Sequence, residues 1–320
     1  MSQIISQSRV TAVVWDERYL QHEMGLYHPE SPERLRAIQK VLQDPSVKSQ
    51  LQFLKPRPAT PEELGLIHKF DYVKLVEKTA GHEVQLDADV VTSPRSWEVA
   101  CLAVGGMLQC VDWVMQIPYR NAFAFVRPPG HHAESEQAMG FCLFNNVAIA
   151  AEYALRKPGI KKVAIVDFDV HHGNGTQHSF YDRSDVFYVS THRYPFYPGT
   201  GARREEGAGL GKGYTLNLPF SGGEGDEEYF KVFSQEIIPI LSDYKPDLLL
   251  VSAGYDAHRR DPLGGMNLTG TGYQMMSEQL MQVADACCQG RAVFVLEGGY
   301  DLQGLAEGVR GSLTAMMKPI

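Results

Sequence analysis

The sequence has little of what marks a secreted, membrane-spanning or disulfide-stabilised protein. It contains five cysteines, an odd number in which no pair forms a C-x-x-C motif, so a regular disulfide framework is excluded and reduced thiols are favoured. No window reaches the roughly 18 consecutive apolar residues that span a membrane. The first residues, MSQIISQSRV, lack the basic and apolar regions of a signal peptide. We therefore expect a cytoplasmic protein that has no membrane partner.

An excess of positive charge is also missing. The net charge is −8 at pH 7, and we expect no nucleic-acid partner, since proteins that bind nucleic acid carry a basic face. The dibasic pairs Arg203-Arg204 and Arg259-Arg260 are interpreted as solvated loops. The chain has no internal repeat, no low-complexity tract and no proline- or serine-rich linker. Its 320 residues, of which 44% are hydrophobic, are predicted to form one domain, residues 1–320.

Continuous apolar runs alternate with segments of helical periodicity. Runs such as LLLV at 248–251 are typical of parallel strands that are buried on both faces. We expect strands at 10–15, 122–126, 163–166, 186–190, 248–251 and 292–296. We expect one helix to begin with Ser31 as N-cap and Pro32 as its first residue, and others at 61–78, 95–116, 145–155, 229–241 and 273–287. This alternation predicts a single-domain α/β fold, a doubly wound, mostly parallel sheet with helices on both faces.

Five of these strands end in sequences rich in chemically reactive side chains. In chain order they are RPPGHH, DFDVHH, STH, GYDAH and EGGY. Ligands of open α/β sheets bind beyond the carboxyl ends of the strands, and parallel strands share one such edge. The sequence therefore predicts that these five segments meet in one functional site.

The segment VDFDVHHGNG has the strongest metal-binding pattern. Asp169 and His171 are two residues apart, so both point to the same face of an extended chain. A catalytic zinc typically has three protein ligands and an open position for water, and Asp256 in GYDAH is the best third ligand. Two carboxylates and one imidazole would also accept ferrous iron or cobalt. Asp167 shares the parity of Asp169, and we expect it to turn toward the site or to orient a neighbouring imidazole.

A pair of histidines and a tyrosine supply the other groups that hydrolysis needs. His131 and His132 follow a rigid RPPG turn, and an imidazole of near-neutral pKa can accept a proton from water. Asp167 and Asn174 are the available partners for the far ring nitrogens. Tyr300 follows two glycines, and its phenol can donate to a carbonyl oxygen as negative charge develops. These groups predict metal-assisted hydrolysis of an amide or ester.

Several long motifs together resemble one enzyme family. RPPGHHAESEQAMGFCLFNN, VDFDVHHGNGTQ, YPGTG, SAGYDAHRRDPLG and LEGGYD, with HPESPERL near the N-terminus, are similar in order and spacing to the metal-dependent histone deacetylases. The resemblance covers about residues 10–315. It is closest to the class II branch and its bacterial acetylpolyamine and acetoin-utilisation relatives. It implies an arginase/deacetylase-like fold and a zinc-dependent deacetylase activity.

The resemblance implies a role for each predicted site residue. The implied zinc ligands are Asp169, His171 and Asp256. His132 would be the proton shuttle and His131 its electrostatic partner, while Tyr300 would polarise the acetyl carbonyl. Asn174 stands where class II members have asparagine and class I members have aspartate. Arg34 falls where relatives have an arginine in an internal acetate channel.

The resemblance also implies a narrow substrate tunnel and potassium ions. The implied tunnel residues are Gly140, Phe141 and Tyr197. The first potassium would be held by the side chains of Asp167 and Ser190 and by main-chain oxygens of Asp167, Asp169, His171 and Thr191. A second would use main-chain oxygens around Phe180, Arg183 and Val186, near Tyr214. The expected cofactors are therefore Zn²⁺, with Fe²⁺ or Co²⁺ as substitutes, and structural K⁺.

The substrate is left open by the resemblance. Polyamine-selective relatives have an acidic residue at the tunnel mouth, and the matching residue, Leu263, is neutral, which favours acetyl-lysine or another acyl amide. Asp87, Asp89 and Glu224 lie on expected rim loops and would supply negative charge for an acetylpolyamine. We therefore expect acetyl-lysine or a small acetylated amine as the substrate. A homo-oligomer is compatible with the sequence.

Two other functions compete with deacetylation. A ureohydrolase would need two manganese ions, but no D-x-D pair lies near Asp256 to bridge them. A non-catalytic module that binds acyl groups would have little use for the histidine pair and Tyr300. Both alternatives are therefore disfavoured. Counting bound metal ions distinguishes a ureohydrolase from a deacetylase, and a turnover assay distinguishes a non-catalytic module from a deacetylase.

Overall fold

The centre of the protein is a parallel sheet of eight strands. The computed structural model describes residues 9–320, so residues 1–8 of the N-terminal segment discussed above lie outside it. The strands are β1 (Val10–Val14), β2 (Leu51–Leu54), β5 (Arg120–Ala124), β6 (Val163–Asp167), β7 (Val186–Arg193), β8 (Thr215–Phe220), β9 (Leu248–Ala253) and β10 (Ala292–Leu296). Their order is β2-β1-β5-β10-β9-β6-β7-β8, and every neighbouring pair is parallel. A separate antiparallel hairpin joins β3 (Val84–Asp87) to β4 (Val90–Thr92).

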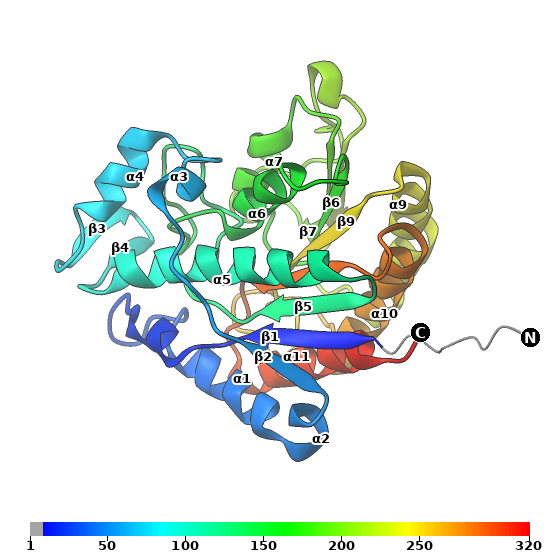
Figure 1. Ribbon diagram of the computed structural model, residues 1–320, viewed down its shortest axis with the longest axis horizontal. Coiled ribbons are helices and arrows are strands. Elements are labelled where there is room, and N and C mark those ends of the chain that lie inside the picture. Colours follow the sequence, from blue (N-terminus) through cyan, green and yellow to red (C-terminus); the bar gives the residue numbers. More distant parts are fainter. Residues whose placement is uncertain (1–8) are drawn as a thin grey trace, which may run out of the picture.

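Helices cover both faces of this sheet, as predicted (Figure 1). One face carries α5 (Ser96–Gln116), α6 (Asn146–Leu155) and α7 (Asn174–Phe180), which pack on β5, β6 and β7. The other carries α1 (Glu33–Gln43), α11 (Leu302–Met317) and α10 (Gly270–Cys287), with α8 (Asp226–Val232), the π-helical turn η3 (Phe233–Ile237) and α9 (Ile238–Tyr244) beside α10. The remaining helices are η1 (Glu17–Gln21), α2 (Pro45–Lys48), α3 (Pro61–Leu64), α4 (Phe70–Glu77) and η2 (Gly209–Gly211).

The central strands are buried on both faces, which explains their continuous apolar sequences. Every residue of β6, β9 and β10 is buried. The register aligns the strand ends, because Asp167 of β6 lies beside Ser190 of β7 and Ser252 of β9. The side chains that follow these strands therefore emerge at one edge of the sheet.

Helix α5 is an internal helix. Among residues 9–320 it is the one helix long and apolar enough to cross a membrane, but 72% of its apolar window is buried in the protein. It packs against β1, β5, β10 and α6, and Figure 1 shows it alongside β5. Packing in the core therefore accounts for its composition.

The helix predicted at 61–78 is in fact two helices, α3 and α4. Gly65 ends α3, and the following segment turns His68 into the core. There Nδ1 of His68 lies 2.9 Å from the main-chain oxygen of Glu134, and Nε2 lies 2.9 Å from the main-chain nitrogen of Asn145. These long-range hydrogen bonds override the local helical periodicity.

The helix predicted at 229–241 begins earlier and is interrupted. It begins at Asp226 as α8, and the π-helical turn η3 interrupts the α-helix just before Pro239, which has no N–H to donate. In α1, Pro32 occupies the N-cap position and no side chain caps the helix, so the prediction of Ser31 as N-cap was wrong. Short-range sequence signals therefore located these helices without fixing their ends.

Several elements had no clear signal in the sequence. The edge strands β2 and β8 and the hairpin are only partly buried, so they lack a continuous apolar run. Helix α11 was also missed. Strand β7 is longer than predicted, and the STH motif lies inside it, because its last residues pair with β8. All five cysteines are free thiols, as predicted.

Candidate active site

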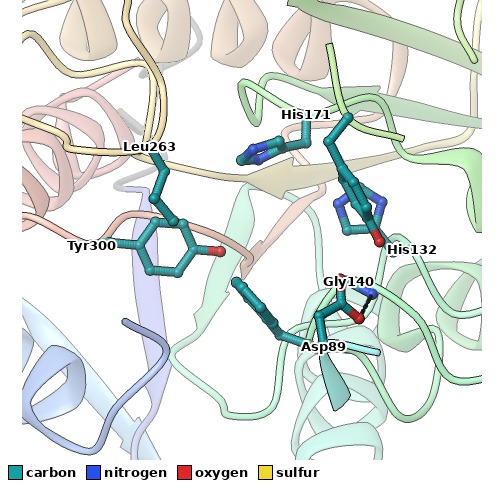
Figure 2. A pocket seen from close by; sticks show the side chains of 8 residues that line it. Asp89, His132, Gly140, His171, Leu263 and Tyr300 are labelled. Carbon is teal, nitrogen blue, oxygen red and sulfur yellow. Dashed lines mark hydrogen bonds between the residues drawn. The ribbon is translucent and has the colours of Figure 1, made fainter. Parts of the chain in front are cut away.

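The five strand-end motifs meet at one edge of the sheet. Their strands, β5, β10, β9, β6 and β7, are consecutive neighbours in the sheet order. A cavity of about 150 Å³ lies at this edge. Its lining residues are Asp89, His132, Gly140, Phe141, His171, Tyr197, Leu263 and Tyr300. Figure 2 shows Tyr300 and His132 on opposite sides of this cavity, with the tyrosine hydroxyl directed into it.

Asp169, His171 and Asp256 bring three potential metal-ligand atoms together. Nδ1 of His171 lies 3.1 Å from Oδ1 of Asp169 and 3.1 Å from Oδ2 of Asp256. The three ligand atoms lie within 4.8 Å of one another. Backbone N–H groups hold the other carboxylate oxygens, Gly298 donating to Oδ2 of Asp169 at 2.7 Å and Val170 to Oδ1 of Asp256 at 2.9 Å. Each carboxylate therefore presents one fixed oxygen to a shared point.

Two glycines allow the carboxylates to approach the backbone. A Cβ atom at Gly254 would lie 2.0 Å from Oδ2 of Asp169, and one at Gly298 would lie 2.2 Å from Oδ2 of Asp256. Any side chain at either position would displace a carboxylate. The glycines in SAGYD and LEGGY therefore have a steric role in this triad.

The triad concentrates negative charge that a cation would neutralise. Burial and repulsion by Asp169 raise the pKa of Asp256 to about 7. Burial disfavours charge on His171, but its hydrogen bonds to both carboxylates raise its pKa to about 10. Carboxylates that raise the pKa of a neighbouring imidazole in this way also favour a cation between them. The donor set fits zinc, and it also fits ferrous iron or cobalt.

The two histidines have different partners and opposite pKa shifts. Their ring centres lie 4.0 Å apart. Nδ1 of His131 lies 2.9 Å from Oδ2 of Asp167, and Nδ1 of His132 lies 2.8 Å from Oδ1 of Asn174. Burial disfavours charge on His131, but the carboxylates of Asp167 and Asp169 raise its pKa to about 10. Burial and the neighbouring imidazoles hold the pKa of His132 well below its usual value. The surroundings therefore favour charge on His131 and oppose it on His132.

A buried glutamate that the sequence analysis missed holds the histidine turn. One oxygen of Glu297 accepts the N–H groups of Gly130 at 2.6 Å and His131 at 3.2 Å, and the other accepts the hydroxyl of Ser252 at 2.9 Å. Burial raises the pKa of Glu297 to about 7. The sequence feature that could have indicated this role is the position of Glu297, a single charged residue directly after the apolar run 292–296.

Tyr300 is held through its backbone and its ring. Oδ2 of Asp261 accepts the N–H of Tyr300 at 2.6 Å and that of the next residue at 3.1 Å, while Oδ1 accepts the N–H of Leu263 at 2.9 Å. The guanidinium of Arg34 lies 5.1 Å from the centre of the Tyr300 ring, and its Nε donates to the main-chain oxygen of Gly299 at 2.7 Å. Asp261, like Glu297, was missed because the catalytic segment that it holds is distant in sequence.

The residues expected to form the tunnel all line the cavity. They are Gly140, Phe141, Tyr197 and Leu263. Of the three acidic rim candidates, Asp89 also lines the cavity, where its Oδ1 accepts the N–H of Gly140 at 3.2 Å (Figure 2). Asp87 is the last residue of β3, and Glu224 lines a separate cavity near Phe220. One carboxylate therefore stands on the wall of an otherwise largely apolar cavity.

The residues expected around the first potassium lie at and just after the end of β6 and inside β7. The hydroxyl of Thr191 lies 3.5 Å from the main-chain oxygen of Asp167, and that of Ser190 lies 2.9 Å from Nδ1 of His192. Burial lowers the pKa of His192 to about 4, so the ring is neutral. Its Nε2 donates to the main-chain oxygen of Gly201 at 2.8 Å, so its Nδ1 accepts the Ser190 proton. The lone pairs of Ser190 can therefore face a cation.

The residues expected around the second potassium lie where α7 leads into β7. The N–H of Arg183 donates to the main-chain oxygen of Phe180 at 3.1 Å, and that of Tyr188 donates to the oxygen of Tyr214 at 3.0 Å. Val186 is the first residue of β7. Each carbonyl oxygen has a second lone pair, so these hydrogen bonds leave room for a further contact.

Comparisons with known proteins identify similar sequences and a similar structure. Residues 28–316 match the family model described as the histone deacetylase domain. The chain is 39% identical to a probable deacetylase of Archaeoglobus fulgidus, over 92% of this chain and 82% of that protein. It is also 39% identical to histone deacetylase 10, chloroplastic, of Oryza sativa subsp. japonica, over 91% of this chain and 70% of that protein. The crystal structure of the HDA15 HD domain is similar, with a TM-score of 0.92, 39% identity, and coverage of 98% of this chain and 90% of that one.

Proposed function

This chain belongs to the histone deacetylase family, and from that premise we propose that it is a zinc-dependent deacetylase. It hydrolyses the amide bond of an acetylated amine such as acetyl-lysine. The catalytic domain comprises residues 1–320. The five free cysteines support a cytoplasmic location, where thiols stay reduced.

One observation carries this proposal, the convergence of the triad, His132 and Tyr300 on a single small cavity. Asp169, His171 and Asp256 would hold the metal ion through the three atoms that already face one another. When bound, such an ion lowers the pKa of a water molecule and polarises the amide carbonyl. Zinc is the proposed ion, and ferrous iron or cobalt fits the same donor set.

His132 is the proton shuttle in this proposal. Burial keeps its imidazole neutral, and its Nδ1 is engaged by Asn174, so Nε2 is the nitrogen that takes a proton from the attacking water. The same nitrogen then gives the proton to the departing amine. His131 is held as a cation by Asp167 and stabilises the negative charge that develops on the substrate.

Tyr300 donates a hydrogen bond to the amide carbonyl oxygen. Burial and the charges of nearby carboxylates raise the pKa of Tyr300 well above its usual value, so the phenol keeps its proton. Its hydroxyl is directed into the cavity (Figure 2). A neutral donor at this place stabilises the oxyanion as it forms.

The cavity wall supports acetyl-lysine as the first candidate substrate. Phe141, Tyr197 and Leu263 offer apolar surface to an alkyl chain, and Leu263 adds no charge. Asp89 supports a second candidate function, that of an acetylpolyamine amidohydrolase. Its carboxylate lines the same cavity and would attract a second, cationic amine of the substrate.

Potassium sites complete the proposal. Asp167, Ser190 and Thr191 contribute to the first, which the orientation of the Ser190 hydroxyl supports. The second uses the carbonyls around Phe180, Arg183, Val186 and Tyr214. We also propose that Arg34, which is buried beside Tyr300, lies on the path by which acetate leaves.

The test of this function combines kinetics with metal counting. The substrates to compare by kcat/KM are an acetyl-lysine peptide, an acetylated polyamine and a longer acyl-lysine amide. We expect turnover of at least one of them, and one zinc ion per chain. Two manganese ions per chain would support a ureohydrolase instead. Binding of acyl amides without turnover would support a non-catalytic module.

A further inference from the structure

Asn174, the partner of His132, is itself held by a glutamate. Nδ2 of Asn174 lies 2.5 Å from Oε1 of Glu134, 3.2 Å from the main-chain oxygen of His132 and 3.5 Å from Sδ of Met139. Nδ1 of His178 lies 2.8 Å from the same oxygen of Glu134. A continuous chain of polar contacts therefore runs from the cavity to His178, whose side chain is 51% exposed.

The chemistry of Glu134 determines which way the Asn174 amide faces. A carboxylate only accepts hydrogen bonds, whereas an amide has an acceptor on one side and a donor on the other. Because Glu134 accepts, the amide nitrogen faces Glu134 and the amide oxygen faces Nδ1 of His132. The amide oxygen only accepts, so Nδ1 of His132 carries the hydrogen. In a neutral imidazole the lone pair then lies on Nε2.

We propose that Glu134 is a positioning residue that selects the Nδ1-protonated form of His132 through Asn174. This inference rests on the proposed function, in which Nε2 of His132 takes a proton. The main-chain oxygen of His132 favours the same amide orientation, but the contact with Glu134 is shorter and involves a charge, which makes it the stronger one. Glu134 lies on a cavity separate from that of the substrate, and its carboxylate is connected to His132 through Asn174.

Glu134→Lys tests this role because a lysine ammonium only donates. It would face the amide nitrogen of Asn174, another donor, and would favour the flipped amide. We expect kcat to fall about 10- to 100-fold, by analogy with the loss of a hydrogen-bond partner behind a metal-ligating histidine. KM should change little, because the cavity wall is intact. The matched control is Glu136→Lys in the same loop, where Glu136 is 58% exposed and pairs with Lys69.

A second substitution can restore the hydrogen-bond polarity. In Glu134→Lys/Asn174→Asp, the lysine donates to one carboxylate oxygen and the other oxygen accepts from Nδ1 of His132. Asn174→Asp alone places two carboxylates in contact, which repel or must share a proton. We expect the double variant to regain at least about tenfold in kcat over each single variant, a coupling typical of residues in direct contact.

The ¹⁵N chemical shifts of the His132 ring report its tautomer without any turnover. In the zinc-loaded wild-type protein we expect the hydrogen on Nδ1, a shift toward Nε2 in Glu134→Lys, and a return to Nδ1 in the double variant. If the wild-type protein deacetylates nothing but these shifts are seen, the proposed function fails and the role of Glu134 stands. Unchanged shifts and kcat in Glu134→Lys, or additive losses without recovery in the double variant, would overturn that role.

Discussion

Asp261 and Tyr300 are joined by a 2.6 Å hydrogen bond from the backbone N–H of the tyrosine to the carboxylate. The other oxygen of that carboxylate accepts the N–H of Leu263 at 2.9 Å. One buried side chain thus ties the loop after β10, which carries the proposed oxyanion donor, to the loop after β9, which forms part of the cavity wall. The position of Tyr300 should therefore depend on Asp261.

Asp261→Asn should loosen this connection, because an amide nitrogen would face backbone N–H groups. We expect kcat to fall about 10- to 100-fold, since small displacements of a catalytic group are costly. We also expect the free energy of unfolding to fall by about 1–3 kcal/mol as a buried donor loses its acceptor. Steady-state kinetics and denaturant unfolding measure the two effects. The exposed Asp243→Asn is the control, and an unchanged kcat in Asp261→Asn would show that other contacts suffice.

Tyr300→Phe should separate carbonyl activation from metal binding. The substitution removes one hydroxyl from the cavity and leaves the triad of Asp169, His171 and Asp256 intact. We expect kcat to fall about 10²- to 10³-fold, the usual cost of losing one oxyanion donor. Zinc content, measured by elemental analysis, should stay at the wild-type value. Wild-type kcat in this variant would remove Tyr300 from the mechanism.

Asp256→Ala should strip the metal ion. It removes one of three converging ligand atoms and a carboxylate that lies beside His171. We expect loss of bound zinc after dialysis and loss of deacetylation together. The exposed Asp243→Ala should keep both. Full zinc stoichiometry in Asp256→Ala would mean that the ion is held elsewhere.

His68 should make the folded protein less stable in acid. Its two hydrogen bonds, to the oxygen of Glu134 and from the nitrogen of Asn145, require the neutral ring. Burial lowers the pKa of His68 from 6.5 to about 4. Below pH 6.5 the unfolded chain binds a proton that the folded protein does not, so stability falls as the pH drops from 6.5 to about 4 and then levels off. The loss over this interval is at most about 3 kcal/mol.

His68→Gln tests this pH dependence by denaturant unfolding at several pH values. A glutamine amide can make the same two hydrogen bonds without titrating. We expect the variant to lose less stability than the wild type between pH 6.5 and about 4. His82→Gln, at an exposed position, should follow the wild type. Parallel curves for His68→Gln and the wild type would exclude His68 as the titrating group.

The central strands of the sheet were predictable because their burial on both faces produces a recognisable local pattern in the sequence. A strand covered on both faces, such as β9, must be apolar at every residue, and β6 and β10 follow the same rule. The edge strands β2 and β8 have partly exposed residues, so their sequences lack a continuous apolar run. The break between α3 and α4 was unpredictable for a different reason, because it depends on hydrogen bonds that His68 makes with distant residues.

The class of fold and the chemical groups of the candidate site could be predicted from local patterns along the chain. Apolar runs, helical periodicity and the spacing within DFDVHH and RPPGHH depend on neighbouring residues, so they can be read along the chain. The groups that hold these side chains in place became visible only in the folded protein. Glu297 under the histidine turn, Asp261 behind Tyr300 and Glu134 behind Asn174 join segments that the chain order separates. Such partners depend on the order and register of the strands, which no local pattern encodes.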